Sequence, residues 1–229
     1  MEFTKLSNRL DLVASFVPAG ARLLDVGSDH AYLPIALLQE GKIEAAIAGE
    51  VVEGPYQSAL QNVADNGLED KIEVRLANGL AAFEATDSIS CITIAGMGGR
   101  LIADILAAGL EKLAGVCRLV LQPNNREDEL RAWLVDHDLR LVDEAILEEN
   151  EKFYEILVVE QGSQELSAKE LRFGPYLMQE QAPAFVQKWS KEVEKLAFAL
   201  EQVPVENQSA RASLEERIAH IKEVLHVSK

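Results

Sequence analysis

The chain has 229 residues, 48% of them hydrophobic, which is enough for one standard domain with a buried core and a small appendage. Its formal net charge of −16 argues against a general nucleic-acid coat and against binding to an anionic membrane surface. No apolar run approaches the length of a membrane span, and the opening "MEFTKLSNRL" lacks the apolar core of a signal peptide. We therefore expect a soluble, cytoplasmic protein with no membrane contact.

The acidic charge is concentrated in the first part of the chain. Residues 1–161 hold 13 basic and 28 acidic side chains, a net charge of −15. Residues 162–229 hold 9 basic and 10 acidic side chains, a net charge of −1. The C-terminal part can therefore present a basic face to a polyanion, although the whole chain is acidic.

The cysteines and histidines do not indicate a metal site. Cys91 and Cys117 both lie inside apolar runs, where we expect small, reduced core residues. No zinc-like spacing relates the four histidines, which are His30, His137, His220 and His226. We expect no metal.

Between residues 21 and 161, short β-rich runs alternate with helical patterns. The runs are "RLLDV", "AAIAGEV", "IEVRLA", "ISCITIA" and "CRLVLQ". Helical patterns over 31–40, 53–66, 99–113 and 126–137 follow the first, second, fourth and fifth runs. Continuous apolar runs are typical of strands buried on both faces, so the pattern predicts an α/β fold with a doubly wound, mostly parallel sheet.

The last two runs interrupt this alternation. Only about "ENE" separates "LRLVDEAILEE" from "KFYEILVVEQ", and parallel strands need a long crossover. We therefore expect an antiparallel hairpin at the edge of a seven-stranded sheet. A parallel sheet that ends in a reversed strand is also the architecture of class I S-adenosylmethionine-dependent methyltransferases. This likeness concerns the fold alone, because one fold can serve many functions.

A polar stretch, "GSQELSAKELRFG", separates this first domain, 1–161, from a second, 162–229. Apolar residues then recur in steps of three and four, at Met178, Ala182, Phe185, Trp189, Val193, Leu196 and Leu200, and again at Leu214, Ile218, Ile221 and Leu225. This spacing predicts two amphipathic helices joined by "EQVPVENQS", a coiled-coil-like helical hairpin. The hairpin could be a structural appendage or a dimer contact. We expect the protein to be a monomer or a weak dimer.

The turn "DVGSDHAYLP" after the first run resembles a nucleotide-binding turn with one glycine. Gly27 is followed by Asp29 and Tyr32 where a dinucleotide site would carry its second and third glycines. A carboxylate at Asp29 would repel a pyrophosphate, whereas a cationic ligand tolerates both Asp25 and Asp29. S-adenosylmethionine, with a sulfonium and an ammonium against one carboxylate, fits this turn better than NAD does.

Polar residues at the ends of the next two strands agree with this interpretation. Glu50 follows Asp25 by 25 residues, where an acidic side chain can accept hydrogen bonds from both ribose hydroxyls. Asn78 could contact the adenine edge, and Gly79 could admit the ring. Each signal alone is weak, because a glutamate at a strand end is often an ordinary surface residue.

Two further motifs end the fourth and fifth strands. In "IAGMGGRL", Gly96, Gly98 and Gly99 leave space for a flat ring without matching the dinucleotide pattern. In "LQPNN", Gln122 and Asn124 can donate and accept hydrogen bonds at the edge of a nucleobase. The alternative is that "QPNN" is merely a turn and a helix cap.

In this order, "KLSNRL", "DVGSDHAYLP", "IAGMGG", "LQPN" and "EKFYEI" closely resemble the bacterial tRNA (adenine(22)-N1)-methyltransferase family. The resemblance spans most of the chain, with the specific motifs in the first domain. It implies binding of S-adenosyl-L-methionine in a Rossmann-like domain and methylation of N1 of an adenosine in the D-arm of tRNA.

The resemblance also implies roles for particular residues. It implies that the cofactor is bound by the first turn and by the following strand ends, namely Asp25, Gly27, Ser28, Asp29, His30, Glu50, Val51, Asn78, Gly79, Ala95, Gly96 and Met97. The candidate substrate site consists of Arg9, Gly98, Gln122, Pro123, Asn124, Phe153 and Tyr154. The candidate catalytic residues are Gln122, Asn124, Met97 and Tyr154.

The chemistry can be argued independently of the resemblance. Adenine N1 carries an in-plane lone pair, so direct in-line attack on the methyl group needs no general base, and positioning should dominate. N1 lies on the Watson–Crick edge, so the base must leave its stack, and Tyr154 or Phe153 could stack on it. "FYE" could instead be core packing. Arg9 and Lys5 are candidates for phosphate contacts.

Two other functions remain open from the sequence. One is a methyltransferase that acts on a small molecule, if the acidic surface excludes tRNA. The other is a non-catalytic assembly protein that uses the helical hairpin.

Overall fold

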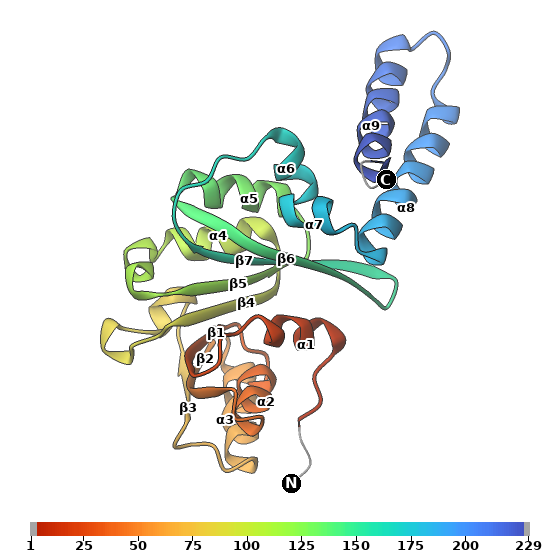
Figure 1. The fold of residues 1–229 in the computed structure, drawn as a ribbon. Helices are drawn as coiled ribbons and strands as arrows, with labels where there is room; N and C mark the ends of the chain where they lie inside the picture. Colours follow the sequence, from red (N-terminus) through yellow and green to blue (C-terminus); the bar gives the residue numbers. More distant parts are fainter. Residues whose placement is uncertain (1–3, 227–229) are drawn as a thin grey trace.

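The computed structural model describes residues 4–226, so the ends of the two predicted domains, 1–3 and 227–229, lie outside the described residues. A seven-stranded sheet forms its centre, in the order β3-β2-β1-β4-β5-β7-β6 (Figure 1). The strands are β1 (Ala21–Val26), β2 (Ile43–Glu50), β3 (Ile72–Leu76), β4 (Cys91–Met97), β5 (Arg118–Pro123), β6 (Leu139–Glu149) and β7 (Lys152–Gln161). The first five are parallel, and β7 runs antiparallel to both β5 and β6. The predicted sheet and its edge hairpin are confirmed.

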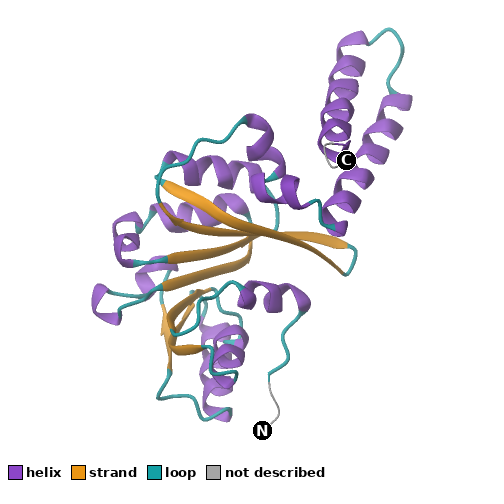
Figure 2. Cartoon of the chain, in the orientation of Figure 1, coloured by secondary structure: helices purple, strands orange, loops and turns teal. Residues whose placement is uncertain are grey.

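Helices cover both faces of this sheet (Figure 2). They are α1 (Asn8–Ser15), α2 (Tyr32–Gln39), α3 (Glu53–Asp65), α4 (Gly99–Ala107), α5 (Glu127–Asp136), α6 (Ala168–Phe173), α7 (Pro175–Glu180), α8 (Pro183–Gln202) and α9 (Gln208–His226). None of these helices, within the described part of the chain, is both long and apolar enough to cross a membrane.

The strands are apolar on both faces because two cores flank the sheet. One core holds α1, α2 and α3 against the sheet, and the other holds α4 and α5. Neighbouring residues of β1 serve different cores, Leu23 the first and Leu24 the second, and both are fully buried. This alternation explains why the sequence shows continuous apolar runs here.

The edge hairpin closes through a two-residue turn at Asn150 and Glu151, which both have positive φ, 52° and 63°. Two consecutive residues with positive φ are typical of the type I′ turn, whose twist matches that of the flanking strands. The local sequence at this turn therefore agrees with the antiparallel pairing of β6 and β7.

The helix predicted over 99–113 is two pieces, which corrects the prediction. α4 ends at Ala107, and a separate short 3-10 helix covers Leu110–Gly115. A Cβ atom at Gly109 would lie 2.8 Å from Cβ of Leu80, so the chain turns at Gly109 in close contact with Leu80. Cys117, expected in the core, is exposed just before β5, whereas Cys91 is buried as predicted.

The helical pattern predicted from Met178 onward is also interrupted. Met178 belongs to α7, and α8 begins only at Pro183. Proline has no backbone N–H and restricts the residue before it, Ala182, to extended backbone, so one helix cannot run through this point. The two long helices α8 and α9 then form the predicted hairpin, which projects away from the sheet (Figure 1).

Helices α6 and α7 pack on α5 and β6, and Phe173 and Leu177 also share an apolar cluster with the hairpin, so residues 162–180 contact both parts. Gly174, between them, has a φ of 82°, and a Cβ atom there would lie 2.7 Å from Glu144 Oε2. The chain can therefore pass close to a buried carboxylate at this point. The division at 161/162 stays a prediction.

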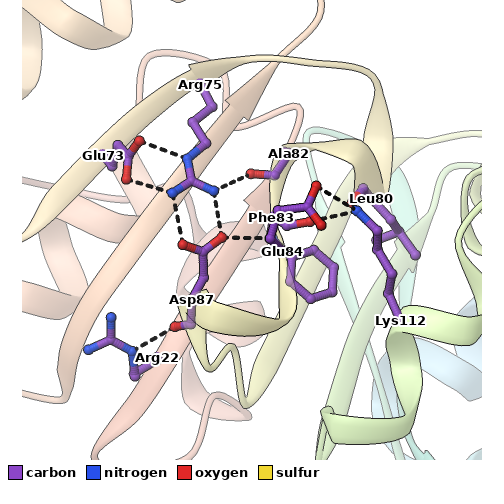
Figure 3. A network of polar contacts seen from close by, with 9 residues as sticks. All are labelled: Arg22, Glu73, Arg75, Leu80, Ala82, Phe83, Glu84, Asp87 and Lys112. Carbon is purple, nitrogen blue, oxygen red and sulfur yellow. Dashed lines mark hydrogen bonds and ion pairs between the residues drawn. The ribbon is translucent and has the colours of Figure 1, made fainter.

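An arginine at the far edge of the sheet holds the loop that follows β3 (Figure 3). Arg75 donates hydrogen bonds to both carboxylate oxygens of Asp87, at 2.6 and 2.9 Å, and to the carbonyl of Ala82 at 2.9 Å. Its hydrogen bonds lower the pKa of Asp87 to about 2. This loop includes Asn78 and Gly79, so the network fixes the segment that carries the predicted adenine contacts.

Candidate functional site

The motifs predicted to bind the cofactor and the base all lie at the same end of the sheet, where the parallel strands have their carboxyl ends. The parallel pairs Glu50–Leu76, Val26–Ile94 and Ala95–Gln122 align the carboxyl ends of β1 to β5. Ligands of open α/β sheets bind at this end, where the strand order reverses next to β1.

The turn after β1 has an unusual backbone. Gly27, Asp29, His30 and Ala31 all have positive φ, at 66°, 46°, 68° and 58°. Three consecutive residues other than glycine in this region store strain of about 1–3 kcal/mol each, and such strain is concentrated at functional sites. The turn is held by hydrogen bonds from Asp29 N–H to Glu50 Oε1 at 2.6 Å and from Asn62 Nδ2 to the His30 carbonyl at 3.0 Å.

Asp25 lies buried beneath this turn. Its carboxylate accepts hydrogen bonds from the hydroxyls of Ser28 and Thr93, each at 2.6 Å. Burial raises the pKa of Asp25, although these two hydrogen bonds lower it. Thr93 was not predicted as a site residue, and its only signal was a polar residue inside an apolar strand.

Glu50 is buried as well, and the sequence could not distinguish this from an ordinary surface position. Burial raises the pKa of Glu50, and the hydrogen bond from the Asp29 backbone lowers it. Asp29 itself is exposed, with Nε2 of His30 3.6 Å from Oδ1 of Asp29. The site therefore combines two buried carboxyl groups with one exposed carboxylate.

A cavity of about 230 Å³ opens beside the turn. Its walls come from the predicted turn and the fourth strand, together with side chains from α1 and α2, namely Arg9, Leu10, Asp25, Gly27, Ser28, Asp29, Leu33, Ala95, Gly96 and Met97. Leu10 and Leu33 were missed, because an apolar residue of an amphipathic helix gives no sign that it faces a ligand. Arg9, predicted to meet phosphates, lies on this cavity, while Lys5 is exposed.

Gly27 and Met97 are in close contact across this cavity. A Cβ atom at Gly27 would lie 2.3 Å from Cε of Met97. This is far inside van der Waals contact, so a side chain at Gly27 would force the flexible end of the Met97 side chain to move.

Gln122 presents no free amide edge in this structure, and its direct contact with a base stays a prediction. The side chain is fully buried. Its Oε1 accepts hydrogen bonds from Arg9 Nη1 at 2.6 Å and from Gly96 N–H at 3.0 Å. Its Nε2 donates to the Pro123 carbonyl at 2.8 Å and to Asn124 Oδ1 at 3.1 Å. Gln122 therefore positions Arg9 and the Gly96 loop.

Asn124 is exposed at the same corner. Its Nδ2 donates to the Gly96 carbonyl at 2.7 Å, and its backbone N–H donates to the Met97 carbonyl at 2.7 Å. The side chain reaches both solvent and the glycine loop, so a base contact by Asn124 stays a prediction.

Tyr154 joins this group, because the Arg9 guanidinium lies 5.6 Å from the centre of its ring. Phe153 points elsewhere and has Lys191 Nζ 4.9 Å from its ring centre. Pro123 is buried, and Gly98 lies against Asn125. The structure therefore brings Tyr154, Arg9, Gln122 and Asn124 together and places Phe153 in a neighbouring cleft.

The predicted adenine contacts lie at the ends of β2 and β3. Val51 is 64% exposed, which is unusual for a valine, and Asn78 is exposed too. Gly79 has a φ of 54°, and a Cβ atom there would lie 2.9 Å from Ile105 Cγ2. An exposed apolar side chain beside a glycine turn suits a flat ring, but these contacts stay a prediction. Within the described residues, no three His, Cys, Asp or Glu side chains are grouped as metal ligands would be.

Comparisons with known proteins identify close relatives. A family model described as tRNA (adenine(22)-N(1))-methyltransferase matches residues 23–223. A protein of that name from Bacillus subtilis (strain 168) is 42% identical over 98% of this chain and 99% of its own. The structure of Streptococcus pneumoniae Sp1610 in complex with S-adenosyl-L-methionine is 66% identical, with a TM-score of 0.90, over 97% of this chain and all of that chain. The M. capricolum TrmK structure in complex with S-adenosyl-homocysteine is 28% identical, with a TM-score of 0.84, over 98% of this chain and 99% of that chain.

Proposed function

This chain belongs to the tRNA (adenine(22)-N(1))-methyltransferase family, and from that premise we propose that it methylates N1 of adenosine 22 in tRNA with S-adenosyl-L-methionine. The observation that carries the proposal is the acidic, left-handed turn at Gly27–Ala31, which opens onto a cavity beside the glycine loop of β4. The cytoplasm is the compartment in which we expect this activity.

The residues of the cavity fit this cofactor. Asp25 and Asp29 suit a sulfonium and an ammonium group, and Arg9 suits the single carboxylate. The absence of a side chain at Gly27 lets the end of the Met97 side chain lie against the turn, where a Cβ atom would displace it. The cofactor supplies the methyl group on its sulfonium.

The chain's own groups bind and orient the reacting base. Gln122 holds the Gly96 loop through its hydrogen bond to the Gly96 amide, and Asn124 holds the carbonyl of the same residue. Tyr154 and Asn124 lie where a base turned out of its stack would enter. Since N1 is neutral and carries a lone pair, no residue is assigned the removal of a proton.

The proposal is tested by incubating the protein with labelled S-adenosyl-L-methionine and unmodified tRNA, then mapping 1-methyladenosine. We expect the modification at position 22, and a tRNA with guanosine at this position should gain no methyl group. Methylation of small molecules alone would favour the small-molecule alternative. Failure to bind S-adenosyl-L-methionine would favour an assembly protein.

Acidification should weaken cofactor binding. Burial raises the pKa of both Asp25 and Glu50, and a bound cation favours their ionised forms. Binding should therefore release protons, and affinity should fall as the pH drops through these raised pKa values. In the free protein, the raised pKa values mean that the folded state binds more protons than the unfolded state. The stability of the free protein therefore falls as the pH rises through these raised pKa values.

Calorimetry in buffers of different ionisation enthalpy measures the proton release directly. Asp25→Asn keeps the shape of the side chain and should lower cofactor affinity about tenfold, or about 1.4 kcal/mol, with less proton release than the wild type. Unchanged affinity and unchanged proton release in this variant would contradict the assigned role of Asp25.

Gln122 and Asn124 should differ in which step they affect. Gln122→Ala releases Arg9 and the Gly96 amide, so we expect weaker cofactor binding together with a methylation rate lowered about ten- to a hundredfold. Asn124→Ala should lower the rate by a similar factor and leave cofactor affinity within about twofold. Equilibrium binding and single-turnover rates separate the two effects, and equal cofactor losses in both variants would contradict this assignment.

A further inference from the structure

A second cleft adjoins the corner where Asn124 lies. It has a volume of about 680 Å³ and runs between the β5–α5 corner and α8, with α6 contributing Arg172. Asn124 and Phe153 lie in its wall, so it continues from the proposed position of the target base. Its charged lining is balanced, with four basic side chains, Arg172, Lys188, Lys191 and Lys195, and four acidic ones, Glu127, Asp128, Glu155 and Glu192.

Three of these four cations already have acidic partners. Lys188 Nζ lies 2.6 Å from Glu155 Oε1 and 3.1 Å from Glu127 Oε1. Lys191 Nζ is 3.0 Å from Glu148, and Lys195 Nζ is 3.6 Å from Glu192 on its own helix. Their net attraction for a further anion is correspondingly reduced.

Arg172 is different, because among the described residues it forms neither an ion pair nor a side-chain hydrogen bond. Its guanidinium carbon lies 5.2 Å from the ring centre of Phe173 and 5.6 Å from that of Trp189. These rings hold the guanidinium in place while its N–H donors stay unused. Burial, and then repulsion from Arg217, lowers the pKa of Arg172, while Glu192 and Asp128 raise it from a longer range.

A partly buried guanidinium with unused donors is suited to one kind of partner. Its planar arrangement of N–H groups matches two oxygens of a phosphate, and partial desolvation strengthens that contact. The proposed substrate carries a phosphate at every nucleotide. Since the proposed function has Asn124 beside the target base, it also puts the nucleotides next to adenosine 22 close to Asn124.

We propose that this cleft binds the RNA strand flanking the methylated adenosine, with a backbone phosphate held by the Arg172 guanidinium. The inference rests on the proposed function and adds to it the place where the strand passes. In a chain of net charge −16, one guanidinium without an ion-pair partner among the described residues gives the strand a local phosphate contact.

The test measures the affinity for unmodified tRNA over a range of salt concentrations. Arg172→Gln should weaken binding about five- to tenfold at low salt and reduce the slope of log affinity against log salt by about 0.7–0.9, the value for one phosphate contact. Arg172→Lys should restore the slope and part of the affinity. Lys71→Gln is the control, because Lys71 is an exposed lysine before β3, at the opposite edge of the sheet.

Unchanged affinity and slope in a folded Arg172→Gln variant would overturn the inference. If that variant melts below the assay temperature, Asn125→Asp replaces it, since it adds one negative charge to the cleft without changing side-chain size. It should weaken tRNA binding, and unchanged binding would overturn the inference. If the wild-type protein methylates tRNA but these variants bind tRNA as the wild type does, only the phosphate site is refuted. If the wild-type protein is inactive, the proposed function is refuted.

Discussion

Replacing Gly27 with alanine should lower affinity for S-adenosyl-L-methionine by at least about a hundredfold. A Cβ atom at this position would lie 2.3 Å from Met97 Cε, and the φ of 66° is itself unfavourable for alanine. Gly27 and Met97 both line the cavity of about 230 Å³ that we assign to the cofactor, so a forced shift of Met97 would change the shape of this cavity. Calorimetric titration with S-adenosyl-L-methionine and S-adenosyl-homocysteine measures the loss.

Two further variants separate blocked space from backbone strain. Gly67 has nearly the same φ, 64°, and a Cβ atom there would have no neighbour within 4 Å, so Gly67→Ala should cost stability and leave cofactor binding unchanged. The double variant Gly27→Ala, Met97→Ala should recover part of the affinity, because the methyl group then meets no side chain. Near-wild-type cofactor affinity in Gly27→Ala alone would show that the cofactor does not use this turn.

Replacing Arg131 with methionine should lower the free energy of unfolding by about 3–5 kcal/mol. Arg131 is fully buried on α5 and donates to Glu144 Oε1 at 2.7 Å and to Glu155 Oε2 at 2.5 Å. Burial alone would raise the pKa of Glu155, but Arg131 and Lys188 together lower it. Without Arg131, two buried carboxyl groups lose their shared partner. Urea unfolding followed by circular dichroism measures the change.

Arg100→Met is the matched control for this substitution. Arg100 lies on α4 and forms one ion pair with Glu129, at 2.6 Å, with both side chains substantially exposed. Exposed pairs of this kind contribute little, so the expected change is below about 1 kcal/mol. Equal effects of the two substitutions would contradict the view that burial makes the Arg131 cluster important. The cluster also includes Lys188 of α8, so loss of Arg131 should loosen the hairpin from the sheet.

Much of the fold could be predicted from the sequence because its signals are local. A strand buried on both faces shows a continuous apolar run, and a two-residue turn between two such runs permits only antiparallel pairing. Errors occurred where a single contact changed the path of the chain. Gly109 ends α4 against Leu80, and Pro183 separates α7 from α8.

The candidate site was predictable to a similar degree and for a related reason. The carboxyl ends of parallel strands meet at one edge of a sheet, so the turn at Gly27, Glu50 and the glycine loop at Gly96 had to lie near one another. Their residue types indicated a cationic ligand. The sequence by itself thus determined the sheet, the edge that carries the site and the charge of the ligand it suits.

Only the tertiary structure decided how individual side chains are used. Gln122 at a strand end has the same local sequence whether its amide faces a base or is occupied by Arg9, which is 113 positions away in the chain. Arg131 and Arg172 are both arginines on helices. Arg131 lies buried between two glutamates, whereas Arg172 forms no ion pair among the described residues. Contacts between segments far apart in the chain leave no local pattern, so which polar groups are satisfied and which remain available to a ligand depends on the packing of the folded chain.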